Sequence, residues 1–112
     1  KGDYAPKYEM ILFATKGRRL LNGGRDPNIV NFARTGNKLH PTQKPVELIS
    51  YLVNKSSEEN DIIYDPFMGS GTTAEAAYVN KRNYIGSEID EIYYEISVTR
   101  AEQVERQGIL FV

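Results

Sequence analysis

The chain has 112 residues, which is enough for one domain or part of one, and 40% of them are hydrophobic, which is enough to form a core. It has no cysteine, which excludes disulfides, and a single histidine, which argues against a metal site. No apolar run reaches the roughly 18 residues that a membrane-spanning helix needs. We therefore expect a cytoplasmic protein. The net charge of −1 conceals an asymmetry, because residues 1–45 hold nine basic and three acidic side chains, whereas residues 46–112 hold five and twelve.

The basic front part of the chain consists of one expected strand and one long loop. Tyr8 to Thr15 is almost continuously apolar, which predicts a strand buried on both faces. Residues 16–39 contain four glycines and a proline and are predicted to form a loop, and loops of this length are usually functional or unstructured. A basic, glycine-rich loop is typical of a surface that faces a polyanion such as nucleic acid, although a solvated loop without a partner would look the same.

A helix is expected after residues 40–45, which read His-Pro-Thr-Gln-Lys-Pro. Pro45 suits the first turn of a helix, because proline has no N–H group and the N–H groups of the first turn have no partner within the helix. The following residues supply an apolar stripe at Val46, Leu48, Ile49, Leu52 and Val53. Residues 56–60 are polar and predict a connector.

The rest of the chain alternates strands and helices. We expect a strand over 61–66, a helix over 72–80, a strand over 83–89 and a long helix from the N-cap Asp90 to about Gln107. Within the last helix, one broad face carries Ile92, Tyr93, Ile96 and Val104. Gly108 is expected to end this helix, and residues 109–112 could begin another strand.

This order predicts a βαβ unit with parallel strands, whose ligands bind beyond the carboxyl ends of the strands. The glycine run Asp65-Pro66-Phe67-Met68-Gly69-Ser70-Gly71-Thr72-Thr73 begins at the end of the first strand, and Glu88 lies at the end of the second. Glycines let a backbone approach a ligand closely, and the start of a helix offers free N–H groups. A carboxylate at Glu88 can accept both hydroxyls of a ribose. The sequence therefore predicts a ligand that contains adenosine.

The residues alone leave the kind of adenosine ligand open. Gly69, Gly71 and Ala74 fit the loose G-x-G-x-x-G/A pattern of dinucleotide sites, so a nicotinamide cofactor is one alternative. Asp65 and Pro66 disfavour it, because a negative charge and a stiff residue precede the turn that a pyrophosphate would approach, and a ligand with an ammonium group suits that charge better. An ATP-type loop is disfavoured because no Gly-Lys-Ser/Thr follows the glycines.

Together, residues 40–45 and 65–73 resemble the DNA methyltransferases that act on the exocyclic amines of adenine (N6) and cytosine (N4), in the beta-group order in which the catalytic half comes first. Residues 84–90 (YIGSEID) are similar to the next signature of that family, and residues 8–16 (YEMILFATK) are similar to the strand that closes its catalytic half. The resemblance implies an α/β, partial Rossmann-like class I methyltransferase fold, with a parallel sheet that is incomplete here and flanked by helices. It also implies two parts: the end of the catalytic half over 1–39 and the cofactor half over 40–112.

The resemblance implies S-adenosyl-L-methionine as cofactor and assigns its contacts residue by residue. Asp65 would lie near the amino-acid moiety, Lys44 and Thr42 beside its carboxylate, Glu88 at the ribose and Ile89 against the adenine. The full set of expected cofactor residues is Thr42, Gln43, Lys44, Asp65, Pro66, Phe67, Gly69, Ser70, Gly71, Thr72, Glu88 and Ile89. His40 is expected to be structural, and no metal is expected.

The resemblance also indicates what this stretch lacks. The family holds the target amine with a run of the Asp-Pro-Pro-Tyr kind, which is absent from these 112 residues and in the family's order would lie upstream of Lys1. We therefore expect no catalytic residue here, no methylation by this chain alone, and a partner catalytic half in the same or a separate chain, or a second copy that completes the sheet. Duplex DNA is the expected substrate, with adenine favoured over cytosine, and the loop residues expected to contact it are Arg18, Arg19, Arg25, Arg34 and Lys38. A non-catalytic remnant that binds cofactor or DNA and a NAD-binding oxidoreductase fragment remain alternatives.

Overall fold

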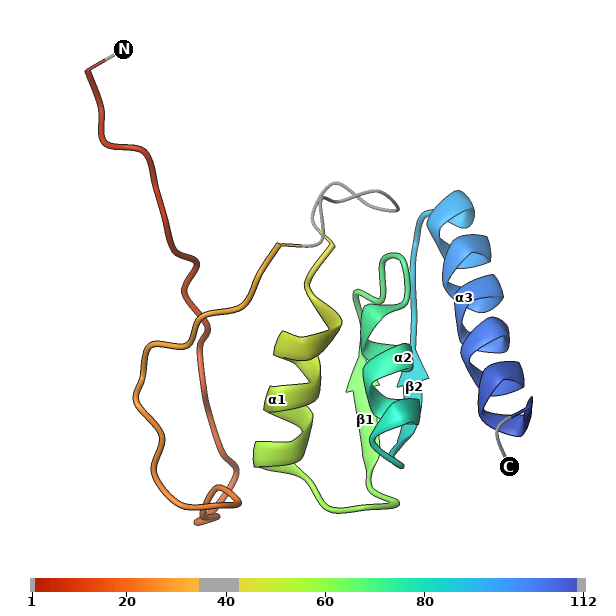
Figure 1. Ribbon diagram of the computed structural model, residues 1–112, viewed down its shortest axis with the longest axis horizontal. Helices are drawn as coiled ribbons and strands as arrows, with labels where there is room; N and C mark the ends of the chain where they lie inside the picture. Colours follow the sequence, from red (N-terminus) through yellow and green to blue (C-terminus); the bar gives the residue numbers. More distant parts are fainter. Residues whose placement is uncertain (1, 35–42, 111–112) are drawn as a thin grey trace.

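A computed structural model describes residues 2–34 and 43–110 of the chain, and a parallel βαβ unit forms its centre (Figure 1). The elements are α1 (Val46–Ser56), β1 (Ile62–Asp65), α2 (Thr72–Val79), β2 (Asn83–Gly86) and α3 (Glu91–Leu110). The two strands pair in parallel, with Ile62 opposite Asn83 and Asp65 opposite Gly86. The parallel pairing and the crossover helix predicted from the sequence are confirmed.

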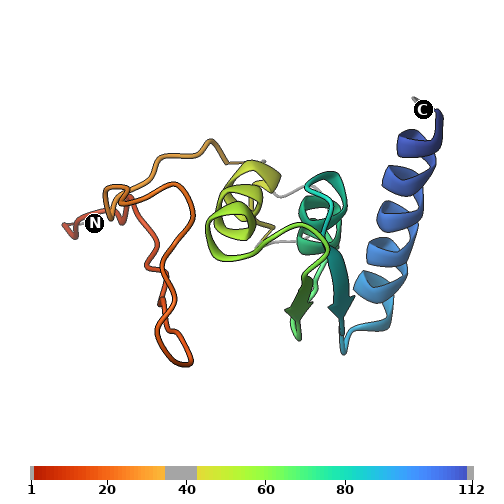
Figure 2. The same cartoon turned by 90° about the horizontal axis from the view of Figure 1, so that it is seen from below.

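Helix α2 packs on one face of the two strands, and α1 and α3 lie on either side of it (Figure 1). Figure 2 shows α1 and α2 on the same side of the sheet, with α3 alongside β2. Helix α2 packs against both α1 and α3, and its buried apolar residues are all alanines (Ala74, Ala76 and Ala77), so the neighbouring backbones can come close. All three helices begin at the edge of the sheet where the strands end (Figure 1). The geometry therefore gathers three helix starts and two strand ends at one edge.

The opposite face of the sheet is open to solvent. Ile62 and Tyr64 on β1 and Ile85 on β2 alternate with inward-facing residues, and all three are more than half exposed. Among the described residues, no large side chain is fully buried. Since both faces of a parallel sheet are normally covered, this open face confirms the expectation of an incomplete sheet.

The strand expected at Tyr8–Thr15 does not form. Within the described residues this segment is extended and exposed, and only β1 and β2 pair as strands. A strand requires a neighbour for its backbone N–H and C=O groups, so an apolar sequence without such a neighbour stays outside the sheet. The segments before α1 also enlarge the molecule: the radius of gyration is 15.5 Å, against about 13 Å for a compact domain of this length.

The end of the chain also differs from expectation. Strand β2 stops at Gly86 instead of Ile89, and α3 passes through Gly108 to Leu110, so residues 109 and 110 are helical and residues 111–112 lie outside the described part. A glycine weakens a helix by about 1 kcal/mol relative to alanine but keeps its N–H group, so it need not end one. No described helix has both the length and the apolar character needed to cross a bilayer.

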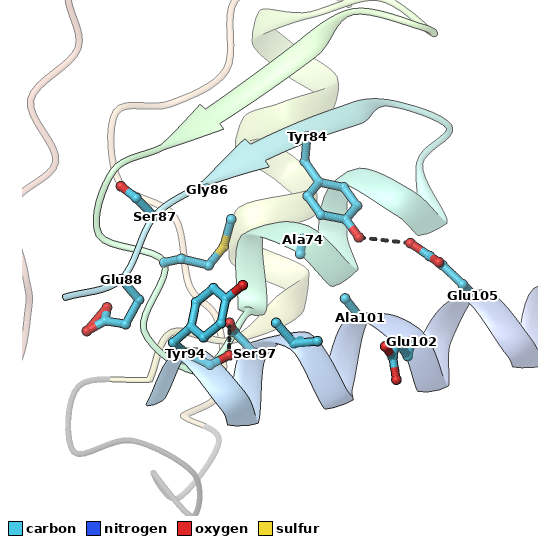
Figure 3. A pocket seen from close by; sticks show the side chains of 12 residues that line it. Ala74, Tyr84, Gly86, Ser87, Glu88, Tyr94, Ser97, Ala101, Glu102 and Glu105 are labelled. Carbon is cyan, nitrogen blue, oxygen red and sulfur yellow. Dashed lines mark hydrogen bonds between the residues drawn. The ribbon is translucent and has the colours of Figure 1, made fainter. Parts of the chain in front are cut away.

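Helix α3 is held against β2 by a hydrogen bond between Tyr84 and Glu105. The Tyr84 hydroxyl donates to Glu105 Oε1 at 2.8 Å (Figure 3). Burial, reinforced by this bond to the carboxylate, raises the pKa of Tyr84 to about 12. An acid whose pKa is higher in the folded state stabilises the fold only while it stays protonated.

We therefore expect the chain to lose stability as the pH rises from about 10, the pKa of an unfolded tyrosine, toward the folded pKa of about 12. Replacing Tyr84 with phenylalanine should remove this part of the alkaline dependence, and urea unfolding at several pH values measures it. Tyr64→Phe is the control, because it removes an exposed hydroxyl from the open face. An alkaline dependence that is unchanged in Tyr84→Phe would contradict the prediction.

Candidate cofactor site

The turn between β1 and α2 is organised by the carboxylate of Asp65, the last residue of β1. Its Oδ1 accepts the Phe67 N–H at 2.9 Å, and its Oδ2 accepts the Thr73 hydroxyl at 2.6 Å, so one side chain fixes both ends of the glycine run. A carboxylate has about four acceptor positions on its two oxygens. Asp65 can therefore hold the turn and still accept a hydrogen bond from a bound cation.

The two central glycines of the turn have backbone conformations that other residues rarely adopt. Gly69 has φ +56° and Gly71 has φ +92°. Gly71 is the N-cap of α2 and provides no side chain to cap the helix, so the first N–H groups of α2 are left for a ligand. A Cβ on Gly71 would also lie 3.1 Å from the Cα of Ser97 on α3. Glycine is thus required here both for its conformation and for the close approach of α3.

Glu88 joins the end of β2 to the same turn. Its Oε2 accepts the Gly69 N–H at 2.9 Å, and its Oε1 lies 3.4 Å from the Asp90 nitrogen. Two backbone hydrogen bonds also join the end of β2 to the turn. The Met68 N–H donates to the Ser87 carbonyl at 2.9 Å, and the Ser87 N–H donates to the Asp65 carbonyl at 3.1 Å. The structure therefore brings the two predicted acidic residues, Asp65 and Glu88, to one turn from neighbouring strands.

Two apolar side chains at this edge of the sheet are exposed to solvent. Phe67 is 87% exposed and Ile89 is fully exposed at 102%. Neither belongs to the core of the described part, so both are available to contact the ring of a ligand or a partner surface. Pro66, beside them, is also exposed.

Ser70 and Thr72 have a different environment from their neighbours. Both are buried, and their hydroxyl oxygens lie within hydrogen-bonding distance of Arg100 on α3. Both were predicted from the sequence as cofactor residues, whereas Arg100 and Thr73 were not. The sequence signal for Thr73 is its place at the end of the Gly-Ser-Gly-Thr-Thr run, whereas no local sequence signal connects Arg100 with a turn 30 residues earlier.

Of the run at residues 40–45, the structure describes only Gln43, Lys44 and Pro45, just before α1. The Lys44 ammonium donates to Glu9 Oε2 at 2.7 Å, and this hydrogen bond is the main cause that lowers the pKa of Glu9. Lys44 thus interacts with the front part of the chain, and its contact with a cofactor stays a prediction. Thr42, His40 and Lys38 lie outside the described residues.

The basic loop is anchored at the other end of α1. Asn22 donates its side-chain N–H groups to the carbonyls of Asn54 and Ser57 at 2.9 and 2.8 Å. Lys55 pairs with Asp26 at 3.0 Å, and the Tyr51 hydroxyl also donates to Asp26 at 2.7 Å. These contacts hold residues 22–26 at the carboxyl end of α1, away from the edge where the helices begin (Figure 1).

The cations of the loop differ in what they contact. Arg19 lies 3.8 Å from Glu58. Arg34 is close enough to Glu9 to help lower the pKa of that carboxyl. Arg18 and Arg25 are exposed. Among the described residues predicted to contact DNA, Arg19 and Arg34 therefore have different acidic neighbours.

A hollow of about 220 Å³ lies between β2, α2 and α3, and Figure 3 shows its walls. Met68 and Ala74 line it from the turn and α2, and Glu88 stands at one end. Pockets that enclose a drug-sized ligand usually measure about 300–1,000 Å³. The volume of this hollow is below that range. No cluster of metal-binding side chains occurs in the described part of the chain.

The sequence matches a known family over most of its length. A family model described as DNA methylase, covering N6 and N4 enzymes, matches residues 25–99. The chain is 36% identical over 100 residues to the putative methylase YubD of Escherichia coli K12, which covers 89% of this chain and 44% of that protein. It is 41% identical over 80 residues to the type II methyltransferase M2.MboI of Moraxella bovis, covering 71% of this chain and 29% of that protein.

A solved structure also resembles this one. The crystal structure of the M1.HpyAVI–SAM complex aligns with a TM-score of 0.61 and 33% identity, over 72% of this chain and 42% of that protein. This chain therefore spans less than half of each of the three proteins.

Proposed function

Because the chain belongs to the N6/N4 DNA methylase family, we propose that it is the S-adenosyl-L-methionine-binding part of a DNA amino-methyltransferase. The observation that carries this proposal is the junction of the two strand ends, where Glu88 accepts the Gly69 N–H from the adjacent turn. This junction places an acidic side chain, a glycine turn and a helix start together, which is the combination that an adenosine cofactor needs. The SAM complex of M1.HpyAVI supports the choice of cofactor.

The residues at the turn fit the chemistry of S-adenosylmethionine. Its amino-acid end carries an ammonium group, and Asp65 provides a negative charge with unused acceptor positions. Glu88 would accept the ribose hydroxyls, and the exposed Ile89 and Phe67 would cover apolar parts of the ligand. The cofactor supplies an electrophilic methyl group, and these residues would bind and orient it.

The methyl acceptor is proposed to be the exocyclic amine of a base in duplex DNA. Of the two amines that the family covers, we propose N6 of adenine, as the resemblance suggests, with N4 of cytosine as the alternative. Digestion of DNA methylated by the complete enzyme, followed by identification of the modified nucleoside, decides between them. N4-methylcytosine as the only product would overturn the choice of base while leaving the rest of the proposal intact.

We propose that the chain binds the cofactor but needs a catalytic half to transfer the methyl group. Its 112 residues contain no run of the Asp-Pro-Pro-Tyr kind, and a base must be flipped from the duplex into a pocket that holds its amine. The open face and edge of the sheet are consistent with a missing part. Incubation of the chain with labelled cofactor and duplex DNA should give no incorporation, and turnover by the chain alone would contradict this division of roles.

The proposed cofactor is tested by calorimetric titration of the chain with S-adenosylmethionine, with NAD as the control ligand. We expect saturable binding of S-adenosylmethionine and none of NAD. Binding of NAD alone would favour the oxidoreductase alternative. Failure to bind either ligand would show that the turn is not a formed cofactor site in this chain, against the proposal.

We also propose that Arg18 and Arg25, with Arg19, Arg34 and Lys38, contact phosphate oxygens of DNA. Phosphate contacts release counterions, so the affinity for DNA should fall steeply with salt, with a slope of about −0.9 for each phosphate contacted. The double variant Arg18→Gln/Arg25→Gln should make this slope shallower by about 2, as measured by fluorescence anisotropy with labelled duplex at several salt concentrations. Lys81→Gln, an exposed cation outside the loop, is the control. Equal slopes in the double variant and the parent chain would contradict the proposal.

A further inference from the structure

Arg100 connects α3 to the turn that precedes α2. Its side chain is only 13% exposed, and its Nε and Nη2 lie 2.7 and 2.6 Å from Glu75 Oε2 on α2. Its Nη1 faces the glycine turn, at 3.1 Å from Thr72 Oγ1, 3.3 Å from Ser70 Oγ and 3.4 Å from the Ser70 carbonyl oxygen. One guanidinium thus contacts an acidic side chain and both neighbours of Gly71.

We propose that Arg100 is a positioning residue that holds the cofactor turn in its binding conformation, an inference that rests on the proposed function and extends it. Gly71 lies between Ser70 and Thr72 with φ +92°. Unusual backbone conformations persist only where the surrounding structure fixes them. Arg100 fixes the residues on both sides of Gly71, so it determines where the N–H groups at the start of α2 point.

A second contact from α3 supports this role. Ser97, one turn earlier on the same helix, lies against Gly71 so closely that a Cβ there would be 3.1 Å from the Ser97 Cα and 3.3 Å from its carbonyl oxygen. Residues 97 and 100 are on the same face of a helix, so α3 contacts the turn at two consecutive positions. The position of α3 and the shape of the cofactor turn are therefore coupled.

A simpler role for Arg100 would be the ion pair with Glu75 alone, which joins α2 to α3. The two roles can be separated because lysine keeps a positive charge but lacks the planar fork with several donors. Arg100→Lys can retain the pairing with Glu75, but a single ammonium cannot bond Glu75, Ser70 and Thr72 in the same geometry. If only the ion pair matters, lysine should replace arginine without effect on the turn.

The experiment compares Arg100→Lys and Arg100→Met with two control variants. Arg106→Met removes an exposed arginine from the same helix, and Val53→Ala weakens the core in α1 without touching the turn. Two quantities are measured: the hydrogen-exchange rates of the Gly69 and Gly71 amides, which are bonded to Glu88 and Met68, and the affinity for S-adenosylmethionine. Thermal unfolding without ligand records overall stability.

For Arg100→Lys we expect a midpoint of unfolding close to that of the parent chain, with exchange at Gly69 and Gly71 at least about tenfold faster and affinity about tenfold lower. Arg100→Met should change the midpoint of unfolding, the exchange rates and the affinity, whereas Val53→Ala should lower only the midpoint of unfolding. Exchange and affinity in Arg100→Lys equal to those of the parent chain would overturn the inference. If the parent chain bound no S-adenosylmethionine, the proposed function would fail, and the exchange rates alone would still decide whether Arg100 holds the turn.

Discussion

Replacement of Gly71 by alanine is expected to lower the free energy of unfolding by about 2–6 kcal/mol and to abolish cofactor binding. The residue has φ +92°, a conformation that costs a residue with a Cβ about 1–3 kcal/mol. The added Cβ would also lie 3.1 Å from Ser97 Cα and 3.3 Å from the Ser97 carbonyl oxygen, which are backbone atoms that cannot move without displacing α3. Overpacking of this kind costs a further 1–3 kcal/mol or so.

Gly24→Ala is the matched control for this substitution. Gly24 has a similar φ of +84°, but nothing lies within 4 Å of the Cβ that alanine would add. This substitution adds a Cβ at positive φ without a steric clash, so we expect a loss of only about 1–2 kcal/mol. Urea unfolding of both variants measures the difference. If both variants lost the same small amount of stability, the close approach of α3 to Gly71 would not be a feature of the protein.

The helices and strands after residue 45 could be predicted because local sequence signals and tertiary structure agree there. Asp90 accepts the Tyr93 N–H at 3.1 Å, which is the capping role that its residue type predicts. Pro45 immediately precedes α1, and the glycine run follows a short apolar strand as expected. These features depend on a few neighbouring residues, so they are visible in a single sequence.

The errors occurred where the outcome depends on distant partners. Residues 8–15 have the composition of a buried strand, but pairing is a property of two segments, and the described part of the chain offers this one no neighbour. The expected face of α3 was also incomplete: Ile92 is exposed, while Ser97 is buried and lies against the glycine turn. Apolar periodicity identifies a helix face only when the partner surface is apolar too.

The candidate site was predicted in outline but not in its internal contacts. The sequence placed Asp65 and Glu88 at neighbouring strand ends, which follows from βαβ topology alone. It could not show that Glu88 accepts the Gly69 N–H or that Arg100 contacts Ser70 and Thr72. Such hydrogen bonds depend on side-chain rotamers and on the distance between α2 and α3. Neither the rotamers nor this distance can be read from a periodic pattern in the sequence.

Glu88→Ala is expected to reduce the affinity for S-adenosylmethionine by at least about a hundredfold. The carboxylate is proposed to accept the ribose hydroxyls, and a hydrogen bond to a charged group contributes about 1.5–3 kcal/mol. The substitution also leaves the Gly69 N–H without the acceptor that lies 2.9 Å away in the present structure. Glu88→Gln should lose less, about tenfold, because its carbonyl oxygen can still accept one bond. Titration calorimetry measures both variants.

The ligand itself offers a way to separate the two functions of Glu88. A cofactor analogue that lacks the ribose 2′-hydroxyl should bind the parent chain more weakly, but it should lose less additional affinity in Glu88→Ala, because the variant has already lost that contact. Additive losses would mean that Glu88 only holds Gly69 and does not touch the ribose. Glu91→Gln, which removes an exposed carboxylate from the first turn of α3, should change neither affinity. Such a cycle distinguishes a carboxylate that binds the ligand from one that shapes the turn.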